Sequence, residues 1–425
     1  MTLRPSAADL LLRCLSARVE PALSDQVGRS SPNEWNEVVD MAVWFKVAPL
    51  LFKRLKKSVA RANVPADAWE RLRIVYFTTA GRNARLYREL GPALRCLRSS
   101  GIKVIVLKGA YLAETVYGDI AVRQMSDVDL LVPKAELSRA QTVLFDTGCF
   151  HPESGRRMAS ASGVQSKGIE SRFRRSRGLQ LADDTGIDTH WTLEFPVGPF
   201  RLDSAGFWDR ARPAMIAGVE VLALSPEDLL LHLCSHAIYG HCLDGNGLRH
   251  LCDIAEAIHR YCGEMVWPEI THRAREWGAS RHVGLALRLA GSMLDTEVPA
   301  EVLERLVPGG FDQRILETAR ERVLAQTPDG QWVARPFFEQ RGVRSIGDKV
   351  KLSWGRVFLS RGEMAEMYPA SRDSKHPWFY YALRLRDVIR TFRSHALERG
   401  RLTTRSRGRN RYVALFNWLE SGKPL

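Results

Sequence analysis

Two acidic residues inside an apolar, strand-like segment constrain the fold of this sequence more than any other feature. Asp127 and Asp129 flank a valine and lead into the apolar residues 130–132. Alternate residues of a strand point to the same face, so the two carboxylates are expected to lie together, roughly 6–7 Å apart at Cα. Two carboxylates in register suit an oxygen-preferring divalent cation. Taken alone, such a pair is more often a strand end capped by surface carboxylates.

An apolar segment that ends in a glycine turn lies upstream of this pair. Residues 102–107 are apolar or β-branched apart from one lysine and lie between two glycines, which predicts a buried strand. Helical apolar spacing follows in residues 109–117. Because backbone N–H groups at the start of a helix attract anions, Lys108 and Gly109 are predicted to hold a triphosphate. The alternative is a turn glycine beside a solvated lysine.

Three more side chains are candidates for the same site. Arg123 lies four residues before Asp127 and offers a planar donor fork suited to phosphate, although it could instead pair with Asp119 or Asp127. Asp188 and His190 share one face of a predicted strand over residues 187–193, so they could hold a metal ion and orient a substrate.

The order of predicted elements indicates an α/β (α+β) fold with helical parts on both sides. A helical N-terminal part is expected over residues 1–100, with helices within 34–56 and over 67–99. The α/β core is expected over 101–224, because strand and helix alternate there, and it includes a basic loop over 151–178. Further helices predicted from the periodicity are 248–262, 268–278, 280–294, 300–306, 312–325 and 378–397. These place a helical domain over 225–330 and a mixed helical C-terminal part over 331–425, with an Arg-rich tail at 399–411.

The composition permits a large core and suggests an anionic partner. The chain has 425 residues, 45% of them hydrophobic and 26% charged, with a net charge of +14. Such an excess favours nucleoside triphosphate, nucleic acid, another acidic substrate or a membrane surface as a partner, or serves solubility alone. The seven cysteines are odd in number and spread out, which argues against a small disulfide framework. No signal-peptide pattern or long apolar run is present, so no membrane span is expected and the cytoplasm is the expected location.

Two basic segments and one Cys/His-rich segment have both functional and structural interpretations. The loop 151–178 could gate the site or hold an anionic acceptor, and the tail 399–411 could grip nucleic acid phosphates. For both, a solvated flexible segment is the alternative. The segment 232–262 contains His232 and His236 at i, i+4, a possible zinc pair. The lack of a CxxC motif favours buried thiols and hydrogen-bonded histidines instead.

In combination, these motifs resemble the bacterial uncharacterised nucleotidyltransferase family, which belongs to the DNA polymerase beta-like nucleotidyltransferase superfamily. The residues that carry the resemblance are Val106–Ala110, Tyr117, Arg123, Ser126–Val132, Asp188, His190, Trp191, Leu224–Asp228, His236 and Asp253, with weaker likeness at Tyr368-Pro369 and Tyr380-Tyr381. The resemblance covers about residues 30–395. It implies a polymerase beta-like core with a mixed sheet.

The resemblance also implies roles for particular residues. Asp127, Asp129 and Asp188 would be catalytic and would bind two Mg²⁺ ions, with Mn²⁺ as a possible substitute. Residues that would hold the nucleoside triphosphate are Lys108, Gly109, Arg123 and Ser126, and residues that would contact the substrate are His190 and His236. The turn Lys108-Gly109-Ala110 departs from the superfamily's usual Gly-Ser and so lacks a phosphate-binding hydroxyl.

The implied reaction moves NMP, by default AMP, from a triphosphate to an acceptor and releases pyrophosphate. The acceptor could be a small molecule, a peptide or protein side chain, or an RNA end. A narrower hypothesis is a tailoring enzyme of a peptide or polysaccharide pathway. A third is an inactive nucleotide- or RNA-binding module that retains the fold, against which the intact trio of Asp127, Asp129 and Asp188 argues.

Overall fold

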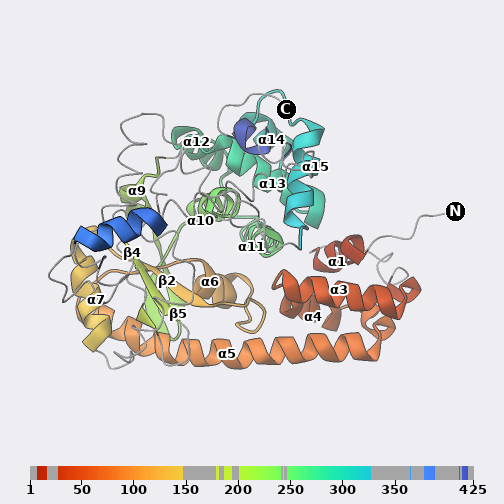
Figure 1. Ribbon diagram of the computed structural model, residues 1–425, viewed down its shortest axis with the longest axis horizontal. Helices are drawn as coiled ribbons and strands as arrows, with labels where there is room; N and C mark the ends of the chain where they lie inside the picture. The colour runs from red at the N-terminus through yellow and green to blue at the C-terminus, as the bar shows by residue number, and fades with distance from the viewer. Residues whose placement is uncertain are drawn as a thin grey trace.

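The computed structural model shows a mixed sheet with helices from both ends of the chain around it (Figure 1). It describes residues 7–16, 27–146, 179–180, 186–193, 201–240, 243, 247–326, 364, 378–387, 411 and 414–419. The predicted basic loop 151–178 and all of the tail 399–411 except Arg411 lie outside the described residues. The α/β fold class predicted from the sequence is confirmed.

Six strands form the sheet, in the order β3-β4-β2-β1-β6-β5. Their bounds are β1 Ile105–Val106, β2 Asp127–Leu131, β3 Leu179–Gln180, β4 Gly186–His190, β5 Arg212–Ile216 and β6 Val219–Ala223. β2 runs parallel to β4, and β1 runs parallel to β6. The other neighbouring pairs are antiparallel. In the β2–β4 pair, Asp129 stands directly opposite Asp188, so residues 59 positions apart (188 minus 129) meet in register.

The first strand is shorter than the sequence predicts, although the segment around it is extended and mostly buried. Only Ile105–Val106 counts as strand. One backbone hydrogen bond extends the strand pairing on each side of β1. Leu107 N–H donates to the Asp129 carbonyl at 2.9 Å, and Leu222 N–H donates to the Val104 carbonyl at 2.9 Å. The first bond holds the turn after β1 against β2, at the level of the acidic pair, and the second holds the residue before β1 against β6.

A hairpin at the far edge of the sheet was not predicted. β5 and β6 are joined by Ala217 and Gly218, whose φ angles are 51° and 69°. Two consecutive left-handed residues suit a tight hairpin turn, but glycine or asparagine usually occupies the first position as well. The unusual Ala217 explains why the turn is hard to recognise. Its N–H donates to the Glu114 carboxylate at 3.0 Å, which ties the turn to the segment after β1.

The N-terminal helices pack beside the sheet and beneath it. Their bounds are α1 Ala7–Leu15, α3 Pro32–Trp44, α4 Ala48–Lys56 and α5 Ala66–Ser99. The predicted helical region 34–56 is split into α3 and α4 at Lys46, which has a φ of 58°. α5 runs along one side of the molecule, with α3 and α4 at one end and the sheet at the other (Figure 1). Near its middle, the Asn83 amide donates to the Arg123 carbonyl at 2.8 Å and so anchors the segment that leads into β2.

Short helical segments surround the strands. After β1 come α6 Lys108–Tyr111 and the π-helical turn η2 Leu112–Val116, and after β2 come the 3₁₀ turn η3 Lys134–Glu136 and α7 Leu137–Asp146. A further short helix, α9 Ser204–Asp209, precedes the hairpin and was also not predicted. The helix predicted over 109–117 thus forms as α6 and η2, and the helix that Pro133 and the following sequence predict over 133–145 forms as η3 and α7.

The C-terminal helices follow the sequence prediction within a few residues. Their bounds are α10 Pro226–Ser235, η5 His236–Gly240, α11 Gly247–Arg260, α12 Trp267–Glu276, α13 Ser280–Leu294, α14 Ala300–Leu306 and α15 Gln313–Val323. Ser225 caps α10 by accepting the Asp228 N–H at 3.2 Å. Of the predicted helix 378–397, residues 378–387 are described and are helical. The division of the chain into separate units stays a prediction.

Candidate functional site

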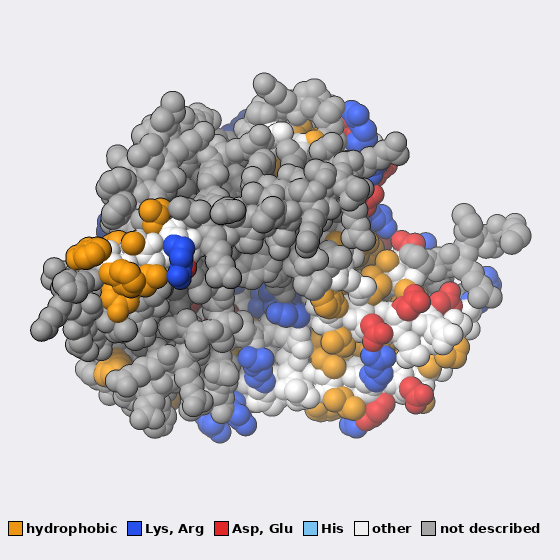
Figure 2. Space-filling view, in the orientation of Figure 1, with side chains coloured by type: hydrophobic (Ala, Val, Ile, Leu, Met, Phe, Trp, Pro, Cys, Tyr) orange, Lys and Arg blue, Asp and Glu red, His pale blue; other side chains and the backbone are white. Residues whose placement is uncertain are grey.

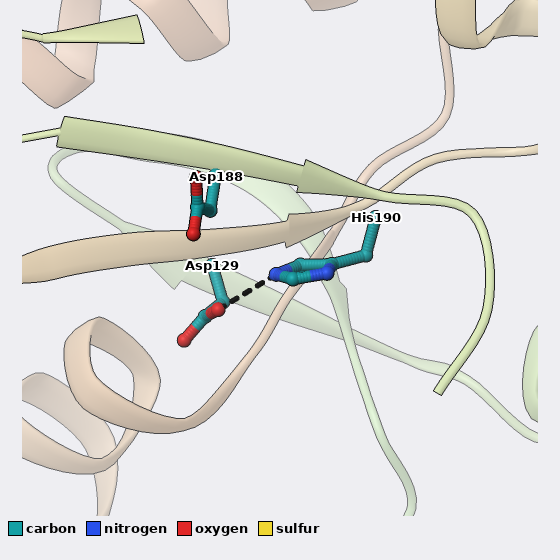
Figure 3. A group of neighbouring side chains, drawn as sticks. All are labelled: Asp129, Asp188 and His190. Atoms are coloured by element: carbon teal, nitrogen blue, oxygen red, sulfur yellow. Dashed lines mark hydrogen bonds and ion pairs between the residues drawn. The ribbon is translucent and has the colours of Figure 1, made fainter. Parts of the chain in front are cut away.

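Adjacent parallel strands place two carboxylates and one imidazole together. Asp129 on β2 and Asp188 and His190 on β4 offer ligand atoms that all lie within 4.8 Å of one another. The two aspartates are register partners, and His190 follows Asp188 by two residues, so it lies on the same face. Figure 3 shows the three side chains converging on one side of the two strands. Within the described part of the chain, this is the group of three that could hold a metal ion.

Asp129 is nearly buried and is held by two cationic or hydrogen-bonding partners. One carboxylate oxygen accepts a hydrogen bond from His190 Nε2 at 2.7 Å, and the other lies 3.2 Å from Lys108 Nζ. Burial pushes the pKa of Asp129 upward, but Lys108 and His190 outweigh it and hold the pKa well below its ordinary value. Asp129 is therefore a stable anion at neutral pH.

The surroundings of Asp188 shift its pKa in the opposite direction. Burial raises its pKa above the ordinary value, and the negative charges of Asp129 and Asp127 add to the increase, while His190 opposes it. A carboxylate that is desolvated beside other carboxylates gains from a bound cation or from a proton. The negative charge of Asp129 is therefore compensated by its neighbours, whereas the negative charge of Asp188 lacks a compensating positive charge.

Asp127 lies at the edge of this group. It is the first residue of β2 and is exposed, and its carboxylate accepts a hydrogen bond from Ser126 Oγ at 3.3 Å. Its charge nevertheless reaches Asp188, whose pKa it raises. The predicted metal trio of Asp127, Asp129 and Asp188 thus shares one region, but the tightest group contains His190 in the place of Asp127.

The turn after β1 brings Lys108 to the acidic group at some conformational cost. Lys108 has a φ of 33°, a left-handed value that residues with a side chain rarely adopt. Such strain persists only where the surroundings hold it, and it is common at functional sites. Here the ion pair with Asp129 and the Leu107 N–H bond to the Asp129 carbonyl hold the turn. Lys108 therefore contacts the acidic group itself, where the sequence predicted contact with a triphosphate.

The next residue, Gly109, has little room for a side chain. A Cβ atom there would lie 3.0 Å from Arg123 Nη1 and 3.0 Å from Met125 Sδ, tighter than ordinary contacts. The sequence interpretation assigned the glycine to close approach of a phosphate. The structure supplies a second reason, which is the packing of Arg123 and Met125 against the start of the helix.

Arg123 is buried and forms an ion pair that the sequence did not predict. Its Nε and Nη2 atoms donate to the Asp253 carboxylate on α11 at 2.9 and 2.8 Å. Tyr117 Oη donates to the same carboxylate at 3.0 Å. The alternative partners were Asp119 and Asp127, whereas the structure gives an ion pair with Asp253, which reaches Arg123 through the packing of α11 on the segment before β2. With two guanidinium nitrogens engaged, Arg123 is better placed to hold this segment than to contact phosphate.

Comparison with known families agrees with this geometry. The family model described as "Uncharacterised nucleotidyltransferase" matches residues 31–295, which is more than half of the chain. The chain belongs to the uncharacterised nucleotidyltransferase family. No curated protein matches it, and no solved structure matches it. The sequence interpretation extended the likeness to about residue 395, but the match ends at 295 and does not include Tyr368-Pro369 or Tyr380-Tyr381.

Several residues of the family motifs have structural contacts that sequence reasoning missed. In the Leu224–Asp228 motif, Asp228 is fully buried and accepts hydrogen bonds from Arg210 Nε at 2.7 Å and Arg273 Nη1 at 3.1 Å. This carboxylate thus joins α10 to α12 and to the end of α9. Trp191, which follows His190, lies under Lys134 Nζ at 4.5 Å from the ring centroid. Both contacts join residues far apart in the sequence, so spacing could not reveal them.

The ring of His236 lies between two other histidines. His232 is stacked at 5.8 Å between ring centroids, and His250 on α11 meets it edge-on at 5.5 Å. Of the Cys/His-rich segment, His241 and Cys242 lie outside the described residues. Among the described residues of 232–262, none belongs to a group of three side chains that could hold a metal ion. The role of His236 in substrate binding stays a prediction.

No helix among the described residues is long and apolar enough to cross a membrane. On the face drawn in Figure 2, acidic side chains lie mainly over the N-terminal helices, with basic side chains among them.

Proposed function

We propose that this chain is a divalent-cation-dependent nucleotidyltransferase that moves NMP from a nucleoside triphosphate to an acceptor and releases pyrophosphate. The observation that supports the proposal most strongly is the register of Asp129 with Asp188 on adjacent parallel strands. Membership of a nucleotidyltransferase family supplies the reaction class. ATP is the default donor because of its abundance.

The chemistry of the donor set fits a divalent cation. Three carboxylates, Asp127, Asp129 and Asp188, would hold Mg²⁺, which prefers oxygen ligands. The same carboxylates are also compatible with Mn²⁺, which likewise prefers oxygen ligands. When bound, one or two such ions would neutralise the triphosphate and stabilise the leaving oxygen.

The protein side chains have distinct tasks in this reaction. Asp188, beside the proposed cation site, would help to take the proton of the acceptor hydroxyl. The acceptor oxygen then forms a bond to the α-phosphorus, the bond to the bridging oxygen breaks in line with it, and pyrophosphate leaves. His190 orients the Asp129 carboxylate, and we propose Lys108, Gly109 and Ser126 as contacts of the phosphates. Arg123 and Asp253 hold the segment before β2 in place.

The charge of the chain narrows the chemistry of the acceptor. A net charge of +14 favours an anionic acceptor such as RNA or a phosphorylated small molecule. The basic loop 151–178 directly precedes the strand segments β3 and β4 in the sequence, which is why we propose it as the acceptor's contact. A cytoplasmic location would supply both the triphosphate and such acceptors.

The test is transfer of label from α-³²P nucleoside triphosphates in the presence of Mg²⁺ or Mn²⁺. Total RNA, a protein extract and a small-molecule extract serve as separate acceptors. We expect a labelled product with the wild type and at least a hundredfold less with Asp129→Asn or Asp188→Asn. Asp209→Asn, which alters an exposed carboxylate at the end of α9, is the matched control and should remain active. Transfer that survives in Asp129→Asn would sink the proposal.

A further inference from the structure

Arg249, in the first turn of α11, has a side chain that its surroundings do not neutralise. Its Nη1 donates to the Gln124 carbonyl at 3.3 Å, and its Nη2 lies 3.5 Å from His250 Nε2. Its Nε is buried and, among the described residues, has no hydrogen-bond partner. No carboxylate of the described residues forms an ion pair with it. A buried polar atom without a partner is costly, which marks the site for a ligand.

The surrounding charges leave an excess of positive charge around Arg249. Arg123 is its neighbour. The buried carboxylate of Asp253 attracts both guanidinium groups, but it already accepts hydrogen bonds from Arg123 and Tyr117. Burial and the repulsion from Arg123 lower the pKa of Arg249 to about 10, against the attraction of Asp253 and Asp127. Two guanidinium groups therefore share one buried carboxylate, and an anion would restore the balance.

The position of Arg249 on its helix is a second unfavourable contribution to the energy of its charge. The first turn of a helix carries the positive end of the helix dipole and free backbone N–H groups. A cation there is repelled, and α11 has no acidic residue in its first turn to compensate. Both the helix end and the guanidinium would be stabilised by the same negatively charged group.

Arg249 also lies next to the candidate active site. Gln124, which accepts its hydrogen bond, is three residues before Asp127 and leads directly into β2. The Asp127 carboxylate is close enough for its charge to act on Arg249. The charge of Asp127 acts on Arg123 as well, but Arg123 Nε and Nη2 are already bonded to Asp253.

We propose that Arg249 binds the phosphate oxygens of the nucleoside triphosphate at this site, the task for which the sequence suggested Arg123. The inference rests on the proposed function, because it names the residue that recognises the donor. A guanidinium presents several donors in a fixed plane and binds phosphate in a bidentate manner. Arg249 would thus recognise the triphosphate rather than the base or the ribose.

The test compares the binding of ATP and adenosine to the full chain by titration calorimetry in the presence of Mg²⁺. We expect the wild type to bind ATP more tightly than adenosine. Arg249→Gln should weaken ATP binding about ten- to a hundredfold and leave adenosine binding within about twofold. Arg249→Lys keeps the charge but loses the planar fork, so it should weaken ATP binding severalfold. Arg260→Gln, the same change at the exposed far end of α11, is the matched control.

The outcomes separate this inference from the proposed function. Equal ATP affinity in the wild type, Arg249→Gln and Arg249→Lys would overturn the inference and leave the proposed function standing. Wild-type protein that binds no triphosphate would overturn the proposed function and the inference with it. A thermal melt of each variant establishes that it is folded. If Arg249→Gln is not folded, Arg249→Lys decides, and unchanged ATP affinity in that variant rejects the inference.

Discussion

Asp129 and Asp188 have the same side chain but make opposite contributions to the folded chain. Asp129 is paired with Lys108 and His190, and its pKa is lowered, so its charge stabilises the fold. Asp188 is desolvated beside other carboxylates, and its pKa is raised, so at neutral pH its charge destabilises the fold. A residue that costs stability in the metal-free protein is typical of a site built for a ligand.

The two aspartates should therefore respond differently to the same substitution. We expect Asp129→Asn to lower the free energy of unfolding by about 1–3 kcal/mol, because Lys108 and His190 lose an anionic partner. Asp188→Asn should raise it by about 1 kcal/mol, because a repelled carboxylate is removed. Urea denaturation at pH 7 in the presence of EDTA measures both. The same sign for both variants would show that the electrostatic account of the pair is incorrect.

At the level of single residues, the sequence revealed which side chains share a face but not which ones pair. The alternation of Asp127 and Asp129, and of Asp188 and His190, follows from the geometry of one strand and is local. The partner of Arg123 is 130 residues away in the sequence. Arg249 was not identified as a candidate, because an arginine at a helix start has no distinguishing pattern until α11 is placed against the segment before β2.

Among the helices and strands, some could also be predicted from local sequence patterns, and others depend on contacts between distant segments. Most of the helices could be predicted because their apolar spacing and caps, such as Ser225 on α10, lie within the element. The six-stranded order and the parallel pairing of β2 with β4 depend on contacts between distant segments. The β5–β6 hairpin escaped prediction because Ala217 occupies a left-handed turn position where glycine or asparagine is expected.

The contact between α11 and the segment before β2 should carry a large part of the stability of the site. Asp253 is buried and joins Arg123 and Tyr117 across this contact. Asp253→Asn leaves a buried guanidinium without its counter-charge, so we expect a loss of about 3–5 kcal/mol in the free energy of unfolding. Tyr117→Phe removes one hydrogen bond and should cost only about 1 kcal/mol.

Chemical denaturation of the wild type and the two variants measures these losses. A separate readout is proteolysis near Gln124, which should become faster in Asp253→Asn than in Tyr117→Phe, because the segment before β2 loses its anchor. If Asp253→Asn is as stable as the wild type, the ion pair does not hold the segment, and the geometry of the site must depend on other contacts.

Across the whole molecule, the N-terminal helices join the C-terminal helices and so frame the sheet. Arg54 on α4 pairs with Glu256 on α11, and Arg320 on α15 lies 3.1 Å from Asp9 on α1. The acidic group on β2 and β4 and the cationic first turn of α11 lie within this framework. The proposed site would therefore combine anionic ligands for a cation with a guanidinium for a phosphate, which is the charge arrangement a metal–nucleotide complex requires.

The central claim is that Asp129 and Asp188 together bind a divalent cation. The most direct measurement is Mn²⁺ binding, followed by the electron paramagnetic resonance signal of the free ion during titration of the full chain. The account predicts saturable binding to the wild type and to Asp209→Asn, and at least tenfold weaker binding to Asp129→Asn and to Asp188→Asn. Equal Mn²⁺ binding by the wild type and both of these variants would contradict it.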